Sequence, residues 1–385
     1  MGRNKVMVVY GTRPEVIKMA PVIRELRAHP DEFDVVICSS GQHREMLTPL
    51  ATYFDVEPDV DAHLMGVSAG LAGFFARAIE ALDAVLDEHK PDIVLVQGDT
   101  STAVAAALAS FYRHIPVGHV EAGLRTGDRM SPFPEEVHRL VVSSLTTWHF
   151  AATSLAARAL LSEGVAPEQV IVTGNTVIDA LLWVAADGDG AAPAWLPPDK
   201  RLVLVTAHRR ESFGAPLERI LRAVRKLVDE VPDVVLAIPV HMNPLVSEVT
   251  RRVLQDHPRI VLLPPVEYLE FTRLLKRAVL VLSDSGGIQE EAPALGVPVL
   301  VMRNHTDRPE AIDVGAARLV GTDPEVILNT ALHLLVDEPA RAAMTAGGSP
   351  YGDGHAAERI VAALAGRDGS VPGVPQSGQV PFRRS

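Results

Sequence analysis

Residues 93–122 read I-V-L-V-Q-G-D-T-S-T-A-V-A-A-A-L-A-S-F-Y-R-H-I-P-V-G-H-V-E-A, and this stretch indicates the fold class. The apolar runs at residues 93–96 and 116–120 are too short for helices. They are also too apolar for strands with one wet face, so we expect both to be buried in a parallel sheet. A helix over residues 101–113 joins them. The stretch therefore predicts a right-handed strand–helix–strand unit of an α/β domain.

Each of these strands is followed by a carboxylate, Asp99 after the first and Glu121 after the second. The carboxyl ends of parallel strands meet at one edge of the sheet, where ligands of open α/β sheets bind. The segment P-F-P-E-E (residues 132–136) adds Glu135 and Glu136 behind two stiffening prolines. Such acids also cap helices and face water, but the glycines interleaved with them let a ligand approach the backbone closely. The pattern favours a reaction centre.

The length and composition exclude several classes of protein. A chain of 385 residues predicts two domains of about 150 to 200 residues. With 47% hydrophobic and 22% charged residues the chain is globular and not disordered. Its 36 Lys and Arg against 48 Asp and Glu give a net charge of −12, which argues against nonspecific binding of nucleic acid or anionic membranes. An anionic ligand therefore needs a locally basic pocket.

The first residues of the chain and its cysteine content indicate the cellular compartment. Residues 1–10 lead directly into a strand, and we expect neither a signal peptide nor a transmembrane helix. The single Cys38 cannot form an internal disulfide and lies in an apolar run, which predicts a core residue. A reducing cytoplasm fits both observations.

Strands and helices alternate in two series separated by a Gly/Pro-rich loop at residues 186–198. We expect a first domain over residues 1–176, which carries the carboxylates, and a second over residues 177–352. Residues 353–366 predict a helix that crosses back to the first domain. Residues 367–385 are rich in Pro and Gly and predict a loose tail.

A second informative stretch, S-D-S-G-G-I-Q-E-E-A-P-A-L-G, covers residues 283–296. A strand, a Ser-Gly-Gly turn and a helix start together make an anion site, because backbone N–H groups and the helix dipole favour phosphate. Glu291 is expected in the first turn, where it would accept ribose hydroxyls. A plain strand–helix turn is the alternative. Basic side chains at other rim positions are suited to a diphosphate: Arg13, Lys18, Arg209, Arg210 and Arg308.

The sequence offers little for a metal or a nicotinamide cofactor. Glu135 and His138 have the i, i+3 spacing of a ligand pair, and His119 precedes Glu121 by two residues. The chain has no second Glu-x-x-His and no Cys cluster, so we expect no metal. It has no G-x-G-x-x-G after a strand, so we expect no nicotinamide cofactor.

A set of ordered motifs spans about residues 5–365, and in this set the chain resembles the non-hydrolysing UDP-N-acetylglucosamine 2-epimerases. The motifs are G-T-R-P-E-V-I-K-M-A-P, G-Q-H-R-E-M-L, Q-G-D-T, H-V-E-A-G-L-R-T, P-F-P-E-E, G-N-T-V-I-D, T-A-H-R-R-E-S, P-V-H-M-N-P, D-S-G-G-I-Q-E-E, R-P-E-A and P-Y-G-D-G. The resemblance implies an α/β fold of two Rossmann-like domains facing across a cleft, the glycosyltransferase B architecture. It also implies a homodimer that needs no added NAD or metal.

The resemblance implies reversible conversion of UDP-N-acetylglucosamine to UDP-N-acetylmannosamine. UDP is eliminated across C1 and C2 to leave a 2-acetamidoglucal, and is then added back with the C2 proton on the other face. Such chemistry needs carboxylates near C2 and a cationic cradle for UDP.

The resemblance also carries roles over to positions of this chain. The catalytic acids would be Asp99, Glu121 and Glu135, with His208 supporting the diphosphate. The matching UDP contacts are Arg13, Lys18, Phe271, Ser285, Gly286, Gly287, Glu291 and Arg308. A second UDP-sugar site would use Gln42, Glu45, Glu135, Arg209 and His241. Which acid removes the C2 proton, and which pathway the product serves, do not follow from the sequence.

Three other functions are compatible with parts of this pattern. A UDP-sugar glycosyltransferase has the same fold, and a fold alone does not name a reaction. A hydrolysing 2-epimerase would differ only in how the glycal is quenched. A UDP-sugar sensor would keep the pocket and lose the acids, but Asp99, Glu121 and Glu135 are all present.

One departure from the family concerns regulation. Bacterial members bind a second, activating UDP-N-acetylglucosamine, and they use an Arg on the loop before the helix at residues 71–88. This chain reads L-M-G-V-S-A-G-L-A-G over residues 64–73, with Ser68 roughly at the position of that Arg. A lost charge-assisted contact is worth about 1.5 to 3 kcal/mol, or roughly ten- to a hundredfold in affinity. Either Arg44 or Arg77 would have to replace it.

We predict that the activating site is weak or empty. Initial rates with UDP-N-acetylglucosamine should then be close to hyperbolic, and reverse turnover of UDP-N-acetylmannosamine should proceed without added activator. Steady-state kinetics in both directions measure this. Strong sigmoidicity, together with an absolute need for UDP-N-acetylglucosamine in the reverse direction, would contradict it.

Overall fold

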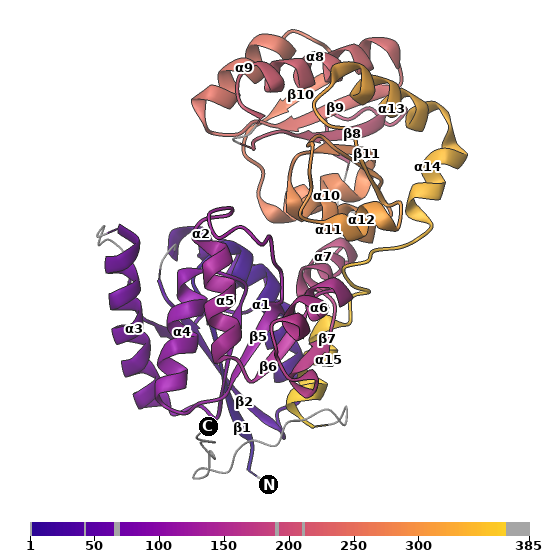
Figure 1. Ribbon diagram of the computed structural model, residues 1–385. Coiled ribbons are helices and arrows are strands. Elements are labelled where there is room, and N and C mark those ends of the chain that lie inside the picture. Colours follow the sequence, from indigo (N-terminus) through magenta and orange to yellow (C-terminus); the bar gives the residue numbers. More distant parts are fainter. Residues whose placement is uncertain (1, 42–43, 65–69, 189–191, 210–211, 367–385) are drawn as a thin grey trace. The chain divides into compact units, whose positions relative to one another are not determined.

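The computed structural model describes residues 2–41, 44–64, 70–188, 192–209 and 212–366. The chain forms two compact units (Figure 1). Unit 1 comprises the chain up to Ala180 together with the residues from Gly352 on, and unit 2 comprises Leu181–Tyr351.

Unit 1 is built on a seven-stranded sheet in the order β3-β2-β1-β4-β5-β6-β7, and every neighbouring pair is parallel. Its strands are β1 Asn4–Tyr10, β2 Phe33–Ser39, β3 Val60–Asp61, β4 Ile93–Gln97, β5 Val117–Ala122, β6 Trp148–Ala151 and β7 Val170–Val172. Its helices are α1 Arg13–Arg27, α2 Arg44–Tyr53, α3 Gly70–His89, α4 Ser101–Tyr112, α5 Glu135–Leu145, α6 Ser154–Ser162, the 3-10 turn η1 Pro167–Gln169, the first part of α7 Thr176–Ala186, and α15 Ala356–Leu364.

The central strands of unit 1 are apolar because both faces of the sheet are covered. All five residues of β4 are buried, which confirms the expectation from its unbroken apolar run. Cys38 on β2 is a buried free cysteine, as predicted. Side-chain caps start two of the helices at defined places: Thr100 Oγ1 accepts from Ala103 N at 3.0 Å for α4, and Thr153 Oγ1 accepts from Ala156 N at 3.2 Å for α6.

Unit 2 contains a six-stranded parallel sheet in the order β10-β9-β8-β11-β12-β13. Its strands are β8 Arg201–Thr206, β9 Val234–Pro239, β10 Ile260–Leu263, β11 Ala278–Ser283, β12 Val299–Val301 and β13 Ala317–Leu319. Its helices, besides the end of α7, are α8 Ala215–Glu230, α9 Pro244–Leu254, α10 Tyr268–Arg277, α11 Gly286–Ala294, α12 Pro309–Asp313, α13 Pro324–Val336 and α14 Glu338–Thr345.

The strand order reverses once in each sheet. In unit 1 the chain winds outward from β1 to β3 and then returns to place β4 on the other side of β1. In unit 2 the same reversal puts β11 beside β8. Loops that leave two such strands diverge to opposite faces of the sheet and leave a crevice at their carboxyl ends, where ligands bind in this class of fold. In each unit we therefore expect a ligand crevice at the carboxyl ends of these two strands.

The last helix returns to unit 1. Figure 1 shows α15 in yellow beside the indigo and magenta elements of that unit, and it packs against α1. Asp179 Oδ1 accepts from Ala357 N at 2.8 Å, and Arg359 donates to the Thr173 carbonyl at 3.0 Å. No helix within the described part of the chain is long and apolar enough to cross a membrane.

Gly11, between β1 and α1, is predicted to tolerate no side chain. A Cβ there would lie 2.2 Å from Ser40 Oγ and 2.5 Å from Thr102 Oγ1, and both hydroxyls are fully buried. We expect Gly11→Ala to lower the free energy of unfolding by about 1 to 3 kcal/mol through overpacking. Urea unfolding measures this. Gly2→Ala, which has nothing within 4 Å, is the control, and equal stability of the two variants would contradict the prediction.

Candidate active site

Glu121 lies at the carboxyl edge of the unit 1 sheet and is held by three donors. Its Oε2 accepts from Lys18 Nζ on α1 and from Gln97 Nε2 at the end of β4, and its Oε1 accepts from Asn175 Nδ2 at 3.4 Å. The backbone of Glu121 has φ 64°, and the register of β5 against β6 shifts there. This left-handed conformation is costly for a residue other than glycine, and such strain gathers at functional sites.

Asp99 follows β4 and is fixed from α5. Arg139 donates from Nε to Asp99 Oδ2 at 2.8 Å, and Nη2 of the same guanidinium group also lies 2.8 Å from that oxygen. His138 Nδ1 lies 2.7 Å from the Asp99 backbone oxygen. His138, which the sequence paired with Glu135 as a possible metal ligand, thus holds the Asp99 turn instead. Within the described residues, no group of three or more His, Cys, Asp or Glu side chains could hold a metal ion.

The structure gives Glu135 and Glu136, which are adjacent in the sequence, different surroundings. Glu136 accepts from the backbone N–H groups of Thr126 at 3.0 Å and Gly127 at 2.9 Å, and from Arg139 at 3.0 Å. Burial acts to raise the pKa of Glu136, but these donors outweigh it and the pKa is lowered. Glu135 Oε2 is buried and accepts no hydrogen bond from any described residue. Glu135 is therefore the acid with an oxygen left for a ligand.

The predicted basic residues of unit 1 both lie on α1. Arg13 is its first residue and is exposed, and Lys18 is half-buried against Glu121. Because α1 follows β1 and α4 follows β4, the structure brings Arg13, Lys18, Asp99 and Glu121 to one crevice.

His208 and Arg209 follow β8 in unit 2 and are anchored by Asp284, which follows β11. Asp284 Oδ2 accepts from the backbone N–H groups of His208 at 2.7 Å and Arg209 at 2.8 Å. Its Oδ1 lies 3.3 Å from His208 Nδ1 without the geometry of a hydrogen bond. Burial lowers the pKa of His208 more than Asp284 raises it, and Arg209 and His241 lower it further. Burial therefore favours the neutral imidazole.

The Ser-Gly-Gly turn opens α11, as the sequence predicts. Ser285 is the N-cap residue, and its N–H donates to Ser283 Oγ at 2.9 Å. A Cβ on Gly286 would lie 3.5 Å from a guanidinium nitrogen of Arg209, so this cation stands beside the helix start. One expectation is wrong: Glu291 lies on the second turn of α11, because the helix already begins at Gly286.

Arg308 and Phe271 occupy separate elements of unit 2. Arg308 donates from Nε to Glu290 Oε1 and from Nη1 to Asp307 Oδ2 at 3.0 Å. Phe271 is half-buried on α10. Arg308 is therefore already paired with carboxylates, and an anion would have to share it.

The residues predicted for a second UDP-sugar site are only partly described. The rings of His208 and His241 stack with centroids 5.7 Å apart and an interplanar angle of 9°, and Arg209 adjoins Gly286. The structure thus places these two residues directly beside residues predicted for the first site. Gln42, Arg210, Ser68 and the side chain of Glu45 lie outside the described residues.

Comparison with known proteins agrees with the motifs. A family model described as UDP-N-acetylglucosamine 2-epimerase matches residues 24–365. The UDP-N-acetylglucosamine 2-epimerase of Yersinia pestis is 49% identical over 370 residues, covering 94% of this chain and 98% of that protein. The Escherichia coli K12 protein of the same name is 48% identical over 369 residues, with the same coverage.

The chain belongs to the UDP-N-acetylglucosamine 2-epimerase family.

A solved structure of a UDP-GlcNAc 2-epimerase of this family, from Neisseria meningitidis, contains UDP-GlcNAc. It superposes with a TM-score of 0.85 at 42% identity, covering 94% of this chain and 99% of that one. This likeness and the two parallel sheets confirm the predicted family and fold class, two Rossmann-like domains of the glycosyltransferase B type.

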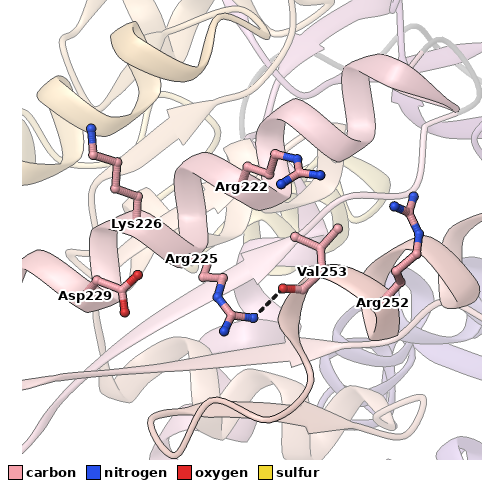
Figure 2. Close-up of a pocket in the computed structure, with 6 residues that line it drawn as sticks. All are labelled: Arg222, Arg225, Lys226, Asp229, Arg252 and Val253. Carbon is pink, nitrogen blue, oxygen red and sulfur yellow. Dashed lines mark hydrogen bonds between the residues drawn. The ribbon is translucent and has the colours of Figure 1, made fainter.

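A pocket on unit 2 lies apart from the predicted residues. Figure 2 shows Arg222, Arg225, Lys226 and Asp229 of α8 around a hollow of about 460 Å³ that Arg252 and Val253 of α9 complete. Arg225 donates to the Val253 carbonyl at 2.6 Å, and Glu218 accepts from both Arg222 and Arg252. Because α8 leaves the carboxyl end of β8, its second half lies toward the opposite edge of the sheet from His208. Arg225 and Arg252 thus join α8 to α9.

Sequence reasoning missed several residues that hold the site. Gln97 and Asn175 donate to Glu121, Arg139 to Asp99, and Asp284 accepts from the loop after β8. The only local signal was their place inside the motifs Q-G-D-T, G-N-T and D-S-G-G and at the end of the P-F-P-E-E-V-H-R segment.

Two buried histidines on adjacent strands predict how stability depends on pH. His119 and His149 are paired in the register of β5 and β6, and Nδ1 of each is buried without a partner among the described residues. Burial, opposed in part by the Gly98 carbonyl 2.8 Å from Nε2, lowers the pKa of His119 to about 4. Burial and the neighbouring His119 lower that of His149 to about 3.

Below about pH 6.5 these histidines bind protons in the unfolded chain but stay neutral in the folded protein. The free energy of unfolding therefore falls as the pH drops toward their folded pKa values. We expect this fall to be shallower in His149→Gln than in the wild type. Urea unfolding followed by circular dichroism, from about pH 7.5 to about pH 5, measures it. Identical slopes would show that His149 does not titrate on unfolding.

Proposed function

We propose that this protein interconverts UDP-N-acetylglucosamine and UDP-N-acetylmannosamine by eliminating UDP and adding it back, without hydrolysis. The observation that carries the proposal is the set of carboxylates at the edge of the unit 1 sheet. Asp99 is paired with Arg139, Glu121 with Lys18, and Glu135 keeps a buried oxygen without a partner among the described residues. Family membership supports the same reaction.

The proposed chemistry requires proton transfer on two faces of the sugar. In the forward direction the C2 proton leaves to a carboxylate, the C1–O bond to UDP breaks, and the electron pair of the C2–H bond forms the double bond of the glycal. The reverse addition delivers a proton to the opposite face of C2 while UDP rejoins C1. Groups on both faces must then exchange protons with the sugar, and we assign these roles to Asp99, Glu121 and Glu135.

Unit 2 offers the features that a departing diphosphate needs. The start of α11 at Ser285, Gly286 and Gly287 presents backbone N–H groups and the positive end of the helix dipole. Arg209 stands beside it, and His208 is anchored next to Arg209. We assign the diphosphate to these groups and Arg308, with Phe271 and Glu291 toward the nucleoside and Arg13 and Lys18 as further cations.

We further propose that the enzyme acts as a homodimer in the cytoplasm. Its substrates are nucleotide sugars, and its single cysteine is a buried free thiol. Phe111 and Tyr112 at the end of α4 are 54% and 65% exposed, which leaves apolar surface for a second copy to cover.

Incubation of the purified protein with UDP-N-acetylglucosamine in D₂O, without any acceptor, tests the function by NMR. Intact UDP-sugar that carries deuterium at C2 is the expected result. Free N-acetylmannosamine with UDP would instead identify a hydrolysing 2-epimerase. Absence of exchange would indicate a glycosyltransferase or a UDP-sugar sensor.

We predict that Asp99→Asn, Glu121→Gln and Glu135→Gln each lower turnover by about 10² or more, the usual range of a lost acid or base. Calorimetric binding of UDP should change little, because the proposed diphosphate cradle lies on unit 2. The matched control is Glu168→Gln, an exposed carboxylate of unit 1. A variant with near-normal turnover would be removed from the catalytic set.

A further inference from the structure

The buried carboxylate of Glu15 joins the starts of two helices. Glu15 is the third residue of α1 and is fully buried. Its Oε2 accepts from Gly11 N at 3.0 Å, Thr12 N at 2.7 Å and Thr12 Oγ1 at 2.8 Å. Its Oε1 accepts from Thr100 Oγ1 at 2.6 Å. All four contacts are hydrogen bonds donated to the carboxylate. They offset the large free-energy cost of burying its charge away from water.

A capping box explains only half of this arrangement. In a capping box a Glu or Gln at the third helical position accepts from the backbone of its own N-cap residue, and Oε2 does so at Thr12. Oε1 serves another helix, because Thr100 is the N-cap of α4 and lies 85 residues away. A residue needed only to start α1 would not require this second contact.

The contact fixes the Thr100 hydroxyl in a defined direction. Thr100 Oγ1 accepts from Ala103 N at 3.0 Å, so its single hydrogen is free to point to Glu15. Asp99 directly precedes Thr100 and is held from the other side by Arg139 and His138. The Asp99–Thr100 turn is therefore held by hydrogen bonds from α5 and from α1, and Glu15 makes the contact from α1.

The hydrogen bond between Glu15 and Thr100 lies close to a residue of the proposed reaction, Asp99. β1 and β4 are neighbours at the reversal of the strand order, and Glu15 ties together the two loops that leave them. The first loop leads into Arg13 at the start of α1, and the second carries Asp99. Burial raises the pKa of Glu15, and the hydrogen bonds from Thr100, Thr12 and Gly11 offset only part of this rise.

We propose that Glu15 is a positioning residue for the epimerisation: through Thr100 it holds the Asp99 turn in register with the β1–α1 loop. The inference rests on the proposed function, since it concerns the rate of that reaction. A displacement of about 1 Å at a reacting group can lower a rate by about 10². Loss of the positioning contact should therefore lower kcat.

Glu15→Gln separates the link from the cap. Glutamine is accepted at this position of a capping box, and its oxygen can still accept from Gly11 and Thr12. Its amide nitrogen then faces Thr100 Oγ1 and can only donate to it, so the hydroxyl loses its charged acceptor and the hydrogen bond between the two helix starts is at best reversed and neutral. We expect kcat to fall by about ten- to a hundredfold, while the calorimetric Kd for UDP stays within about threefold of the wild type.

Thr100 provides the reciprocal variants. Thr100→Val removes the hydroxyl and should lower kcat by a similar factor, whereas Thr100→Ser restores the donor and should recover most of the activity. The Glu15→Gln and Thr100→Val changes should be strongly non-additive in kcat, because either one breaks the same link. Additive effects would overturn the proposal.

The control for a lost helix cap is Thr153→Val. Thr153 caps α6 in the same unit in the same way, with Oγ1 accepting from Ala156 N at 3.2 Å. It should lower the melting temperature as Thr100→Val does but leave kcat unchanged within about twofold, as expected for a change that acts on stability alone. An equal loss of kcat in Thr153→Val would overturn the positioning role.

The wild-type assay in D₂O keeps the two hypotheses apart. No C2 exchange in the wild type overturns the proposed function. Normal exchange in the wild type together with a folded Glu15→Gln protein of equal kcat overturns the role of Glu15 and leaves the function standing. If Glu15→Gln does not fold, the pair Thr100→Val and Thr100→Ser decides the question by the same comparison of kcat with UDP affinity.

Discussion

The ion pair between Lys18 and Glu121 is the interaction on which the unit 1 site depends. Glu121 has a side chain only 10% exposed and a left-handed backbone, and a buried carboxylate is unfavourable unless a cation and hydrogen-bond donors compensate it. Lys18 supplies the charge, and Gln97 and Asn175 supply donors. The place of Lys18 depends in turn on how α1 leaves β1, so the start of this helix is a condition for a charged group at the sheet edge.

The two units use one topological device for different chemistry. In each, the loops after the two strands at the reversal carry the polar residues: β1 and β4 in unit 1, β8 and β11 in unit 2. Unit 1 has Asp99 after β4, held by Arg139, and Glu121 at the end of the adjacent β5, held by Lys18. Unit 2 gathers backbone N–H groups and guanidinium groups near Asp284, whose Oδ2 holds the backbone after β8. The same fold thus produces an acidic and a cationic edge, and the side chains after the strands decide which.

The sequence could predict what depends on neighbouring residues. Apolar runs located β4 and β11 because strands buried on both faces admit few polar residues, and the turn before α11 followed from its glycines. The resemblance alone named Glu135 over Glu136, and the physical reason needed the three-dimensional structure, because Thr126, Gly127 and Arg139 donate to Glu136.

Contacts between distant segments leave no periodic trace. Asn175 reaches Glu121 across 54 positions and Thr100 reaches Glu15 across 85, so neither was foreseen. The position of Glu291 was misjudged by one helical turn because glycines admit a helix start as readily as a loop.

The return of α15 to α1 also sets an order of events during synthesis. A ribosome delivers α1 first and α15 only after all of Leu181–Tyr351 has been made. Throughout that interval the face of α1 that α15 covers stays open, while the intervening unit has every strand and helix it needs to fold on its own. The unit that begins the chain is therefore the last to be completed.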